Sequence, residues 1–419
     1  MTTPTPRFAK CAISSPQTKP CQAPAFTAKI KVSLRFPPLH YFDHNSTTPI
    51  APEVAAALSA ALRDVYGNPS STHRAGQLAR QAFEQSRRTI ADALRVSPAE
   101  IVFTSGGTES NNLAILGSFR NLPKPAHAVT LAIEHPAVLE PFRQLELAGF
   151  EISFVRSVES VAAAIRPDTA LVSIMHANNE TGAIQPIDEI AKLITARRAA
   201  GQPIYFHSDG VQSFGKIPVD LSQTPVDLYS LSAHKIFGPK GIGALFVRKT
   251  TPLHAIQFGG RHERERRPGT ENVPSAVAFA RAVELASAAD SAALGPLRNS
   301  FESQLLSRLP DIQINGANLA RLPNTSNILF RGVSAEALVI ALDMRQMAVS
   351  TGAACSSGSL EPSHVLLAMG LSREEARSSI RFSFGRYNTA DEVSALADAV
   401  VESVNKLRSR STKDARLAG

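Results

Sequence analysis

The 419-residue chain has only three cysteines and no apolar run that approaches the roughly 20 residues of a membrane-spanning helix. Cys11 and Cys21 lie in the first 40 residues, which leaves Cys355 as the one cysteine of the body. So few cysteines exclude a disulfide framework and favour a reducing compartment. Without a long apolar run, no membrane partner is expected.

An excess of positive charge is also missing from the body of the chain. The net charge of +8 would suggest a nucleic-acid partner, but its basic residues lie at the ends. Residues 1–42 hold six Lys and Arg and no acid, and residues 406–419 hold five against one acid. Of the 44 basic and 36 acidic residues, the body therefore keeps 33 and 35. This balance predicts no nucleic-acid partner, and 43% apolar with 19% charged residues indicates a globular protein.

The N-terminal extension, residues 1–40, is basic and rich in Pro, Ser and Thr, without the apolar core of a signal peptide. Its lack of acids partly fits an organellar transit peptide, whereas its prolines oppose the amphipathic helix that such a peptide needs. A disordered tail, or a start site assigned too far upstream, explains the extension equally well. We expect a cytoplasmic protein, or a mitochondrial or plastid one if residues 1–40 are a transit peptide.

Helix-like and strand-like runs alternate along most of the chain. Residues 52–65 and 75–94 have helical patterns. Strand-like runs recur at 101–104, 128–133, 151–155, 170–175, 204–208, 226–231 and 243–247. Because helical stretches such as 138–147 and 187–198 separate most of them, we predict an α/β fold with a mostly parallel central sheet covered by helices. Ligands of such sheets bind beyond the carboxyl ends of the strands.

From about residue 280 the pattern becomes helix-rich, with strand candidates at 326–330 and 379–383. We interpret this part as a smaller α+β domain. The expected organisation is an extension at 1–40, a large domain at 41–285, a small domain at 286–405 and a basic tail at 406–419.

Two strand-like runs end in residues that suit a carbonyl cofactor with a pyridine ring. The run 226–231 is followed by Ser-Ala-His-Lys, which places Lys235 just beyond a strand, and the run 204–208 is followed by Asp209. An amine for a Schiff base and a carboxylate for the pyridinium nitrogen are the two anchors that pyridoxal phosphate needs. A surface lysine is the simpler interpretation of Lys235 alone, and its pairing with Asp209 favours the cofactor.

Other polar side chains are expected at the same edge of the sheet. The Gly-Gly-Thr of segment 104–112 lets N–H groups at a helix start bind a phosphate, while Thr108 or Ser110 can cap the helix. A plain strand–helix turn is the alternative, and the absence of Gly-Lys-Ser/Thr excludes a nucleotide P-loop. His135, where a strand ends and Pro136 starts a helix, can stack on a planar ring and act as an acid or base. A structural histidine is the alternative. The His and Asp residues are too dispersed for a metal site.

Three segments in the second half carry further candidates. Cys355 lies in a Gly-, Ser- and Ala-rich stretch, 349–362, which suggests a mobile loop with an exposed thiol. Arg381 lies in an apolar strand-like run and needs an anion, for which a substrate carboxylate is the natural choice. The Arg-rich loop 259–270 is either solvated or contacts a phosphate or a partner subunit.

As an ordered set, these residues resemble the PLP-dependent cysteine desulfurases, which are fold type I transferases of the class V aminotransferase superfamily. The likeness runs from about Tyr41 to Val404 and includes Tyr-Phe-Asp at 41–43, Thr-Thr-Pro at 47–49 and Gly-Asn-Pro-Ser-Ser at 67–71. The stretch Cys-Ser-Ser-Gly-Ser-Leu-Glu-Pro, which begins at Cys355, is similar to the long cysteine loop of the group that serves iron–sulfur cluster assembly.

The resemblance implies a homodimer that converts L-cysteine to L-alanine and leaves the sulfur as a persulfide on Cys355, for transfer to scaffold or carrier proteins. Lys235 would bond the cofactor and abstract the Cα proton, Asp209 would pair with the pyridine nitrogen, and His135 would stack on the ring and shuttle a proton. Arg381 would clamp the α-carboxylate of cysteine. Gln212 and Asn179 would lie near the phenolic oxygen of the cofactor, and Asn179 would also contact the substrate. The phosphate of the cofactor would be held by Gly107, Thr108, Ser232, His234 and, from the neighbouring subunit, Thr270. No resident metal is implied, although Cys355 is a candidate for a transient iron–sulfur ligand.

The loop before Thr270 departs from the family, because Arg261 and Glu265 stand where glycine is common. The path of this loop can therefore differ here. A selenocysteine lyase or a PLP-dependent aminotransferase of the same fold is the alternative function. A cofactor-free scaffold for sulfur transfer is the non-enzymatic alternative, and it requires Lys235 to be unreactive.

Overall fold

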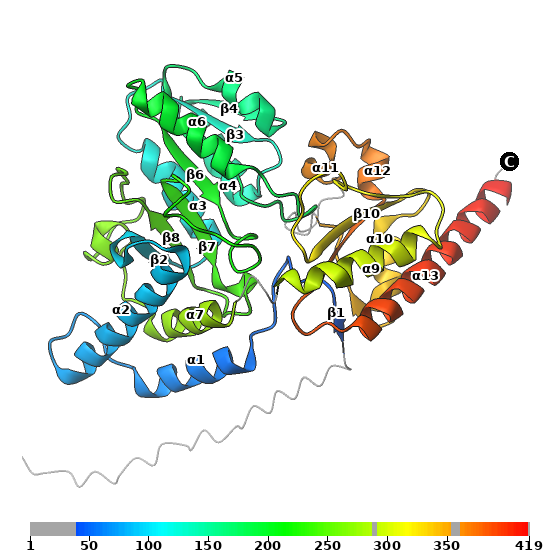
Figure 1. Cartoon of the computed structure of the whole chain (residues 1–419), viewed down its shortest axis with the longest axis horizontal. Helices are drawn as coiled ribbons and strands as arrows, with labels where there is room; N and C mark the ends of the chain where they lie inside the picture. Colours follow the sequence, from blue (N-terminus) through cyan, green and yellow to red (C-terminus); the bar gives the residue numbers. More distant parts are fainter. Residues whose placement is uncertain (1–38, 287–290, 353–360, 418–419) are drawn as a thin grey trace, which may run out of the picture. The chain divides into compact units, whose positions relative to one another are not determined.

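The computed structural model describes residues 39–286, 291–352 and 361–417, with the backbone alone from residue 411 onward. These residues form a large seven-stranded sheet, a small three-stranded sheet and a two-stranded pair, with their helices (Figure 1). None of the helices in these ranges is long and apolar enough to cross a membrane.

The large sheet has seven strands in the order β2-β8-β7-β6-β5-β3-β4. Its strands are β2 (Ile101–Thr104), β3 (His127–Leu131), β4 (Glu151–Val155), β5 (Thr169–Ser173), β6 (Tyr205–Asp209), β7 (Leu228–Ser232) and β8 (Gly243–Val247). Within this sheet only β8 runs antiparallel to its neighbours, so the predicted mostly parallel sheet is confirmed. The predicted strands at 101–104, 151–155 and 243–247 are correct to the residue, whereas the others differ by one or two residues at their ends.

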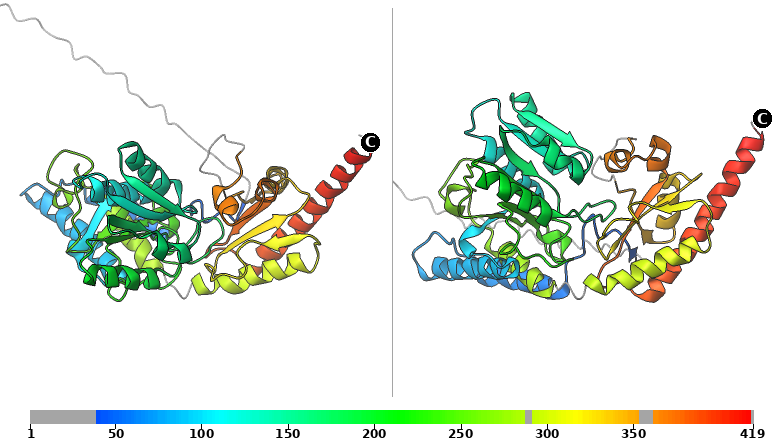
Figure 2. Two further views of the ribbon diagram at one scale, coloured as in Figure 1. Left: turned by 90° about the horizontal axis from the view of Figure 1, so that it is seen from above. Right: turned by 45° about the horizontal axis from the view of Figure 1, so that its top comes forward.

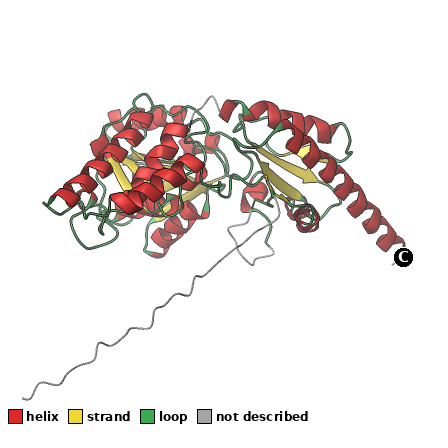
Figure 3. Cartoon of the chain, turned by 90° about the horizontal axis from the view of Figure 1, so that it is seen from below, coloured by secondary structure: helices red, strands yellow, loops and turns green. Residues whose placement is uncertain are grey.

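Helices cover both faces of this sheet, as the views in Figures 2 and 3 show. Successive side chains of β2 point to opposite faces of the sheet: Ile101 and Phe103 belong to one buried cluster, and Val102 belongs to the other. The first cluster includes residues of α1 (Pro52–Asp64), α2 (Arg74–Leu94), α5 (Val161–Ala164), α6 (Ile187–Ala199) and α7 (Val273–Leu285). The second includes residues of α3 (Gly107–Phe119) and α4 (Pro136–Leu147). Because both faces are buried, strands such as β2 and β8 are nearly continuous apolar runs rather than alternating ones.

The small sheet is antiparallel, in the order β12-β10-β9. Its strands are β9 (Ile312–Ile314), β10 (Thr325–Phe330) and β12 (Ser379–Ser383). Their apolar side chains pack in a third cluster against α9 (Leu294–Leu306), α10 (Ala335–Asp343) and α13 (Ala390–Leu417), while α11 (His364–Ala368) and α12 (Arg373–Arg377) are short helices before β12. Basic residues from 406 onward, expected as a tail, continue α13 as far as Leu417. The predicted domain boundaries stay predictions.

The first described segment of the chain runs beside the small sheet before it enters the large one. β1 (His40–Tyr41) pairs in parallel with β11 (Met347–Ala348), and Asp43 bridges to Ser383 of β12. Phe42 is fully buried among side chains that otherwise come from residues 294–404. The chain then passes along the carboxyl ends of the central strands and begins α1 at Pro52. This segment therefore contacts both sheets, and it contributes to the cavity described next.

Candidate active site

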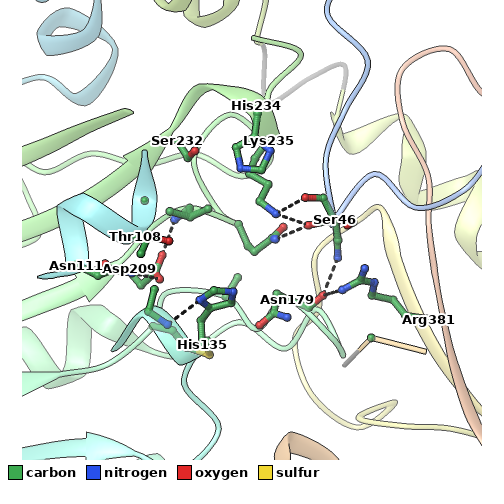
Figure 4. Close-up of a pocket in the computed structure, with 18 residues that line it drawn as sticks. Ser46, Thr108, Asn111, His135, Asn179, Asp209, Ser232, His234, Lys235 and Arg381 are labelled. Carbon is green, nitrogen blue, oxygen red and sulfur yellow. Dashed lines mark hydrogen bonds between the residues drawn. The ribbon is translucent and has the colours of Figure 1, made fainter. Parts of the chain in front are cut away.

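A cavity of about 250 Å³ lies at the carboxyl ends of β2, β6 and β7 and beside the turns that follow β3 and β5. Its lining contains the predicted site residues Gly107, Thr108, His135, Asn179, Asp209, Gln212, Ser232, His234, Lys235 and Arg381 (Figure 4). The fold thus brings together residues that are spread over more than half of the chain. Their individual chemical roles stay predictions.

Lys235 ends the one-turn helix η3 (Ala233–Lys235), which directly follows the fully buried strand β7. Its Nζ donates hydrogen bonds to the backbone oxygens of Asn45, at 2.7 Å, and Ser46, at 2.6 Å (Figure 4). Two carbonyl groups of the segment between β1 and α1 therefore hold this amine in the wall of the cavity.

Asp209 is the last residue of β6 and is 7% exposed. One carboxylate oxygen accepts a hydrogen bond of 2.7 Å from Asn111 Nδ2, and the other accepts one of 2.9 Å from the backbone N–H of Val211. These bonds fix a negative charge in the cavity wall. Asn111, in the second turn of α3, was not predicted, because nothing in its local pattern shows which strand end it meets.

His135 is the N-cap of α4, where its Nδ1 accepts a hydrogen bond of 3.0 Å from the N–H of Ala137. The Nδ1 atom is an acceptor, so a neutral ring carries its proton on Nε2. Burial lowers the pKa of His135; Asp209 raises it, whereas Lys235 lowers it further. His135 is therefore a neutral imidazole at neutral pH, able to accept a proton.

The first turn of α3 contributes backbone N–H groups to the cavity. Gly106 is the N-cap and makes no side-chain cap, so the prediction that Thr108 or Ser110 caps this helix is wrong. The Ser110 hydroxyl instead lies 2.8 Å from the hydroxyl of Thr104, which leaves the first N–H groups of the helix available to an anion. A Cβ at Gly107 would lie 2.6 Å from Val211 Cγ2, so this turn has no room for a side chain.

Ser232 and His234 lie at the end of β7 and in the turn after it. His234 Nδ1 lies 3.1 Å from the hydroxyl of Thr47, and its backbone oxygen accepts from Thr48. Burial, followed by the nearby charge of Lys235, lowers the pKa of His234 to about 4. A neutral histidine and a hydroxyl therefore face this side of the cavity.

Arg381 already has an anionic partner that the sequence did not indicate. Its Nη2 donates to Asp43 Oδ1 at 2.6 Å. Its Nη1 donates to the backbone oxygen of Asn179 at 3.0 Å (Figure 4). The side chain is 3% exposed, and its Nε has no hydrogen-bond partner among the described residues. The anion predicted for Arg381 is thus in part a residue of the protein, while the orphaned Nε leaves a donor for a second acceptor.

The Arg-rich loop lies outside this cavity. Arg261 and Glu265, the departures from the family pattern, form an exposed ion pair with each other. The loop is anchored by Glu263, whose buried carboxylate receives two hydrogen bonds from Arg87, at 2.7 and 2.8 Å. Thr270 is exposed and lines a different cavity, so the structure does not bring it together with the other predicted residues.

Cys355, predicted to be the nucleophile, lies outside the described residues, within 353–360. The residues on either side are described. Gly352, at φ +86°, borders the cavity, and Ser363 caps α11. Both positions lie close to the carboxylate of Glu180. Ser363 Oγ donates to its Oε2 at 2.5 Å, and a Cβ added at Gly352 would lie 3.1 Å from the same oxygen.

Asn45 is the residue of the site that sequence reasoning missed most completely. Its side chain donates to Asn179 and Thr325 and accepts from Lys216 and Asn324, while its backbone oxygen accepts from Gln212 and Lys235. It is 1% exposed. Only its place within the conspicuous stretch 41–49 could have drawn attention to it, because its partners are 134 to 280 residues away.

The donor set of the cavity fits pyridoxal phosphate. The wall holds one primary amine, one buried carboxylate and, at Gly107, a helix start whose N–H groups no side chain caps, beside hydroxyls. An aldehyde, a pyridine nitrogen and a phosphate are the matching groups of this cofactor.

Comparison with known proteins gave one family and many relatives. The model of the aminotransferase class-V family matches residues 40–396. The cysteine desulfurase IscS of Dictyoglomus turgidum is 44% identical over 379 residues, which cover 88% of this chain and 95% of that protein. The cysteine desulfurase IscS of Azotobacter vinelandii is 44% identical over 384 residues, covering 88% and 93%.

Solved structures are similar over the same part of the chain. A NifS-like protein superimposes with a TM-score of 0.80 at 36% identity, covering 87% of this chain and 99% of that one. A structure described as SspA in complex with cysteine has a TM-score of 0.74 at 37% identity, covering 84% and 100%.

Proposed function

The chain belongs to the aminotransferase class-V family, and we propose that it acts as a cysteine desulfurase, which converts L-cysteine to L-alanine. The sulfur is left on Cys355 as a persulfide and supplies iron–sulfur clusters or thiolated cofactors. The observation that carries this conclusion is the one cavity that Lys235, Asp209 and Arg381 line together. The cysteine desulfurases at 44% identity over most of the chain support it.

Cysteine desulfurases of this family depend on pyridoxal phosphate, which when bound supplies an electron sink for the negative charge left at the substrate Cα. Lys235 would bond its aldehyde carbon, and Asp209 would pair with its pyridine nitrogen. The start of α3, with Thr108, Ser232 and His234, is the place for the phosphate. These assignments are supported by the amine, the carboxylate and the free N–H groups of the cavity wall.

The remaining steps belong to side chains of this protein. Arg381 holds the α-carboxylate of cysteine, for which its orphaned Nε is available. The Lys235 amine takes the proton from Cα, and the neutral imidazole of His135 accepts and returns a proton nearby. The Cys355 thiolate attacks the substrate sulfur: a sulfur–sulfur bond forms, the Cβ–sulfur bond breaks, Cβ takes up a proton, and Cα regains the proton that Lys235 removed, which yields alanine.

The experiment that tests this function follows alanine and sulfide together, with L-cysteine and a thiol reductant, in the wild type and in Cys355→Ala. We expect the wild type to release both in equal amounts and the variant to lose at least about 100-fold of both rates, because the sulfur acceptor is gone. Cys11→Ala, which removes a cysteine of the extension, is the control with an unchanged rate. Alanine and sulfide formation that survives in Cys355→Ala would contradict the role of this thiol.

Selenocysteine lyase and aminotransferase activities of the same fold are distinguished with the same two proteins. A selenocysteine lyase would turn over selenocysteine much faster than cysteine, and an aminotransferase would transfer the amino group to a keto acid equally well without Cys355. A cofactor-free scaffold would bind no pyridoxal phosphate at all. Borohydride reduction of the loaded wild type, followed by peptide mass spectrometry, should place the cofactor on Lys235.

We infer further that the protein is a homodimer in the cytoplasm and delivers sulfur to scaffold or carrier proteins. The exposed position of Thr270, away from the cavity of its own chain, supports a role for it at the phosphate of a second subunit. Mass measurement in solution tests the dimer, and fractionation of cells that express the full chain tests the compartment, with mitochondria or plastids as the alternative.

A further inference from the structure

A second buried lysine lies beside the cavity, and the proposed reaction gives it no task. Lys216 is 8% exposed and follows β6 by seven residues. Its Nζ donates to Gln212 Oε1 at 2.7 Å and to Asn45 Oδ1 at 3.0 Å. It forms no ion pair with any carboxylate of the described residues, so its two acceptors are neutral amide oxygens.

These two hydrogen bonds help to decide which way both amides point, and Asn45 is also held by Asn324, Asn179 and Thr325. A side-chain amide has the same shape in either orientation, and its hydrogen-bond partners alone distinguish oxygen from nitrogen. Lys216 presents N–H donors, so both amides turn their oxygens towards it. The nitrogen of Gln212 must then face the other way, and it donates to the backbone oxygen of Asn45 at 2.9 Å. The Lys235 amine donates to that same oxygen.

The surroundings of Lys216 disfavour its charged form. Burial lowers its pKa well below the usual range, and the positive charges of Lys235 and Arg381 lower it further. In either protonation state the amine offers N–H donors to its two amide acceptors.

We propose that Lys216 is a positioning residue: it fixes the amide of Gln212 so that the N–H donor faces the cofactor cavity beside the Lys235 amine. The inference rests on the proposed function, because Gln212 acts there on bound pyridoxal phosphate. Without Lys216 only the backbone oxygen of Asn45 still favours this orientation. The turned amide, which would present an oxygen to the phenolic oxygen of the cofactor, is then more populated. Two acceptors facing each other repel, so the bound cofactor should hold its protons differently.

The test compares Lys216→Met, Gln212→Ala and the double variant, each loaded with pyridoxal phosphate and free of substrate. The readouts are the pH midpoint of the visible absorption of the bound cofactor and its dissociation constant. We expect Lys216→Met and Gln212→Ala to shift the midpoint in the same direction by about one pH unit, a tenfold change in the proton equilibrium. The double variant should show no larger shift than Gln212→Ala alone, because Lys216 acts through Gln212.

Lys249→Met, on an exposed lysine, is the matched control and should leave both readouts unchanged. If Lys216→Met does not fold, Lys216→Gln keeps an N–H donor at that position and should show a smaller shift. A midpoint that stays at its wild-type value, or shifts that add in the double variant, would overturn the inference even if thermal stability falls. A wild type that binds no cofactor would overturn the proposed function as well.

Discussion

Neutral donors, rather than a cation, hold the carboxylate of Asp209. Asn111 and the N–H of Val211 occupy one oxygen each, and no ion pair of Asp209 is formed within the described residues. A carboxylate held in this way keeps both oxygens in a fixed direction. In the proposed function, its pairing with a pyridine nitrogen would therefore depend on Asn111, which lies on a different element.

Asn111→Ala should weaken the binding of pyridoxal phosphate about tenfold or more. A hydrogen bond to a charged group contributes about 1.5–3 kcal/mol, and part of this is lost as misplacement of the carboxylate. The dissociation constant is measured by titration of the cofactor's absorption. Asn112→Ala is the control, because that side chain bonds to the backbone of its own helix at Thr108. Equal losses in the two variants would point to a general weakening of α3 instead.

At this scale, sequence reasoning found residues that end a strand and missed residues that meet them from elsewhere. Lys235 and Asp209 were conspicuous because polar groups follow apolar runs. Asn111 and Lys216 lie in helical or turn segments with ordinary polar composition. Their partners are set by packing across the sheet, which no local pattern contains.

Among the elements, the turn η4 (Glu263–Glu265) has the least favourable backbone. Glu263, Arg264 and Glu265 have φ values of 45°, 56° and 63°, in the left-handed region that costs non-glycine residues free energy. Glu263 offsets this cost. Its carboxylate accepts from Arg87 of α2 and from the N–H of Phe103 in β2, so the turn is attached to a helix and a strand.

Glu263→Gln should lower the free energy of unfolding by up to about 3–5 kcal/mol, because the buried Arg87 loses its buried carboxylate partner and keeps only the half-exposed Glu84. Urea unfolding of the full chain measures this change. Glu265→Gln, two residues further along the same turn, breaks only an exposed pair with Arg261 and should change the value by less than about 1 kcal/mol. A small effect of both substitutions would show that the turn is held by other contacts.

The elements themselves were mostly predictable, and their ends and anchors were not. Apolar runs marked the strands because both faces of the sheet are buried. The expected cap of α3 was wrong, because the Ser110 hydroxyl bonds to Thr104 of the preceding strand. The anchor of η4 joins residues 176 positions apart, a distance over which the sequence gives no signal.

Buried histidines couple the stability of the whole molecule to pH. Burial lowers the pKa of His207 to about 3 and that of His176 to about 4, and burial followed by the charge of Lys216 lowers that of His44 to about 4. The unfolded chain binds protons at these residues near pH 6.5, whereas the folded chain does not. Their effect is therefore absent above about pH 6.5, and stability falls as the pH decreases from there towards the folded values.

His207→Gln should flatten this fall. Each such histidine contributes a slope of up to about 1.4 kcal/mol per pH unit, and the substitution removes one of them. The free energy of unfolding, measured in urea at several pH values between 6.5 and 4, gives the slope. His254→Gln, on an exposed histidine, serves as the control. An unchanged slope in His207→Gln would mean that this ring is protonated in the folded protein.

For the molecule as a whole, the alternation of strand-like and helix-like runs was enough to predict the large sheet and a second sheet near the C-terminus. It was not enough to place residues 40–49. Phe42 completes the cluster of the small sheet, and Asn45 joins that sheet to the large one through Asn324 and Lys216. A short polar segment has too little periodicity to indicate that it contacts both.

The burial of Phe42 among residues 294–404 has a consequence for synthesis on the ribosome. At about 5–20 residues per second, this phenylalanine waits many seconds for the partners that cover it. During that interval the nascent polypeptide exposes an apolar site near its leading end, while the central strands can already associate. Translation speed and the chaperones that bind emerging chains should therefore affect the yield of this enzyme more than they affect proteins whose domains are contiguous in sequence.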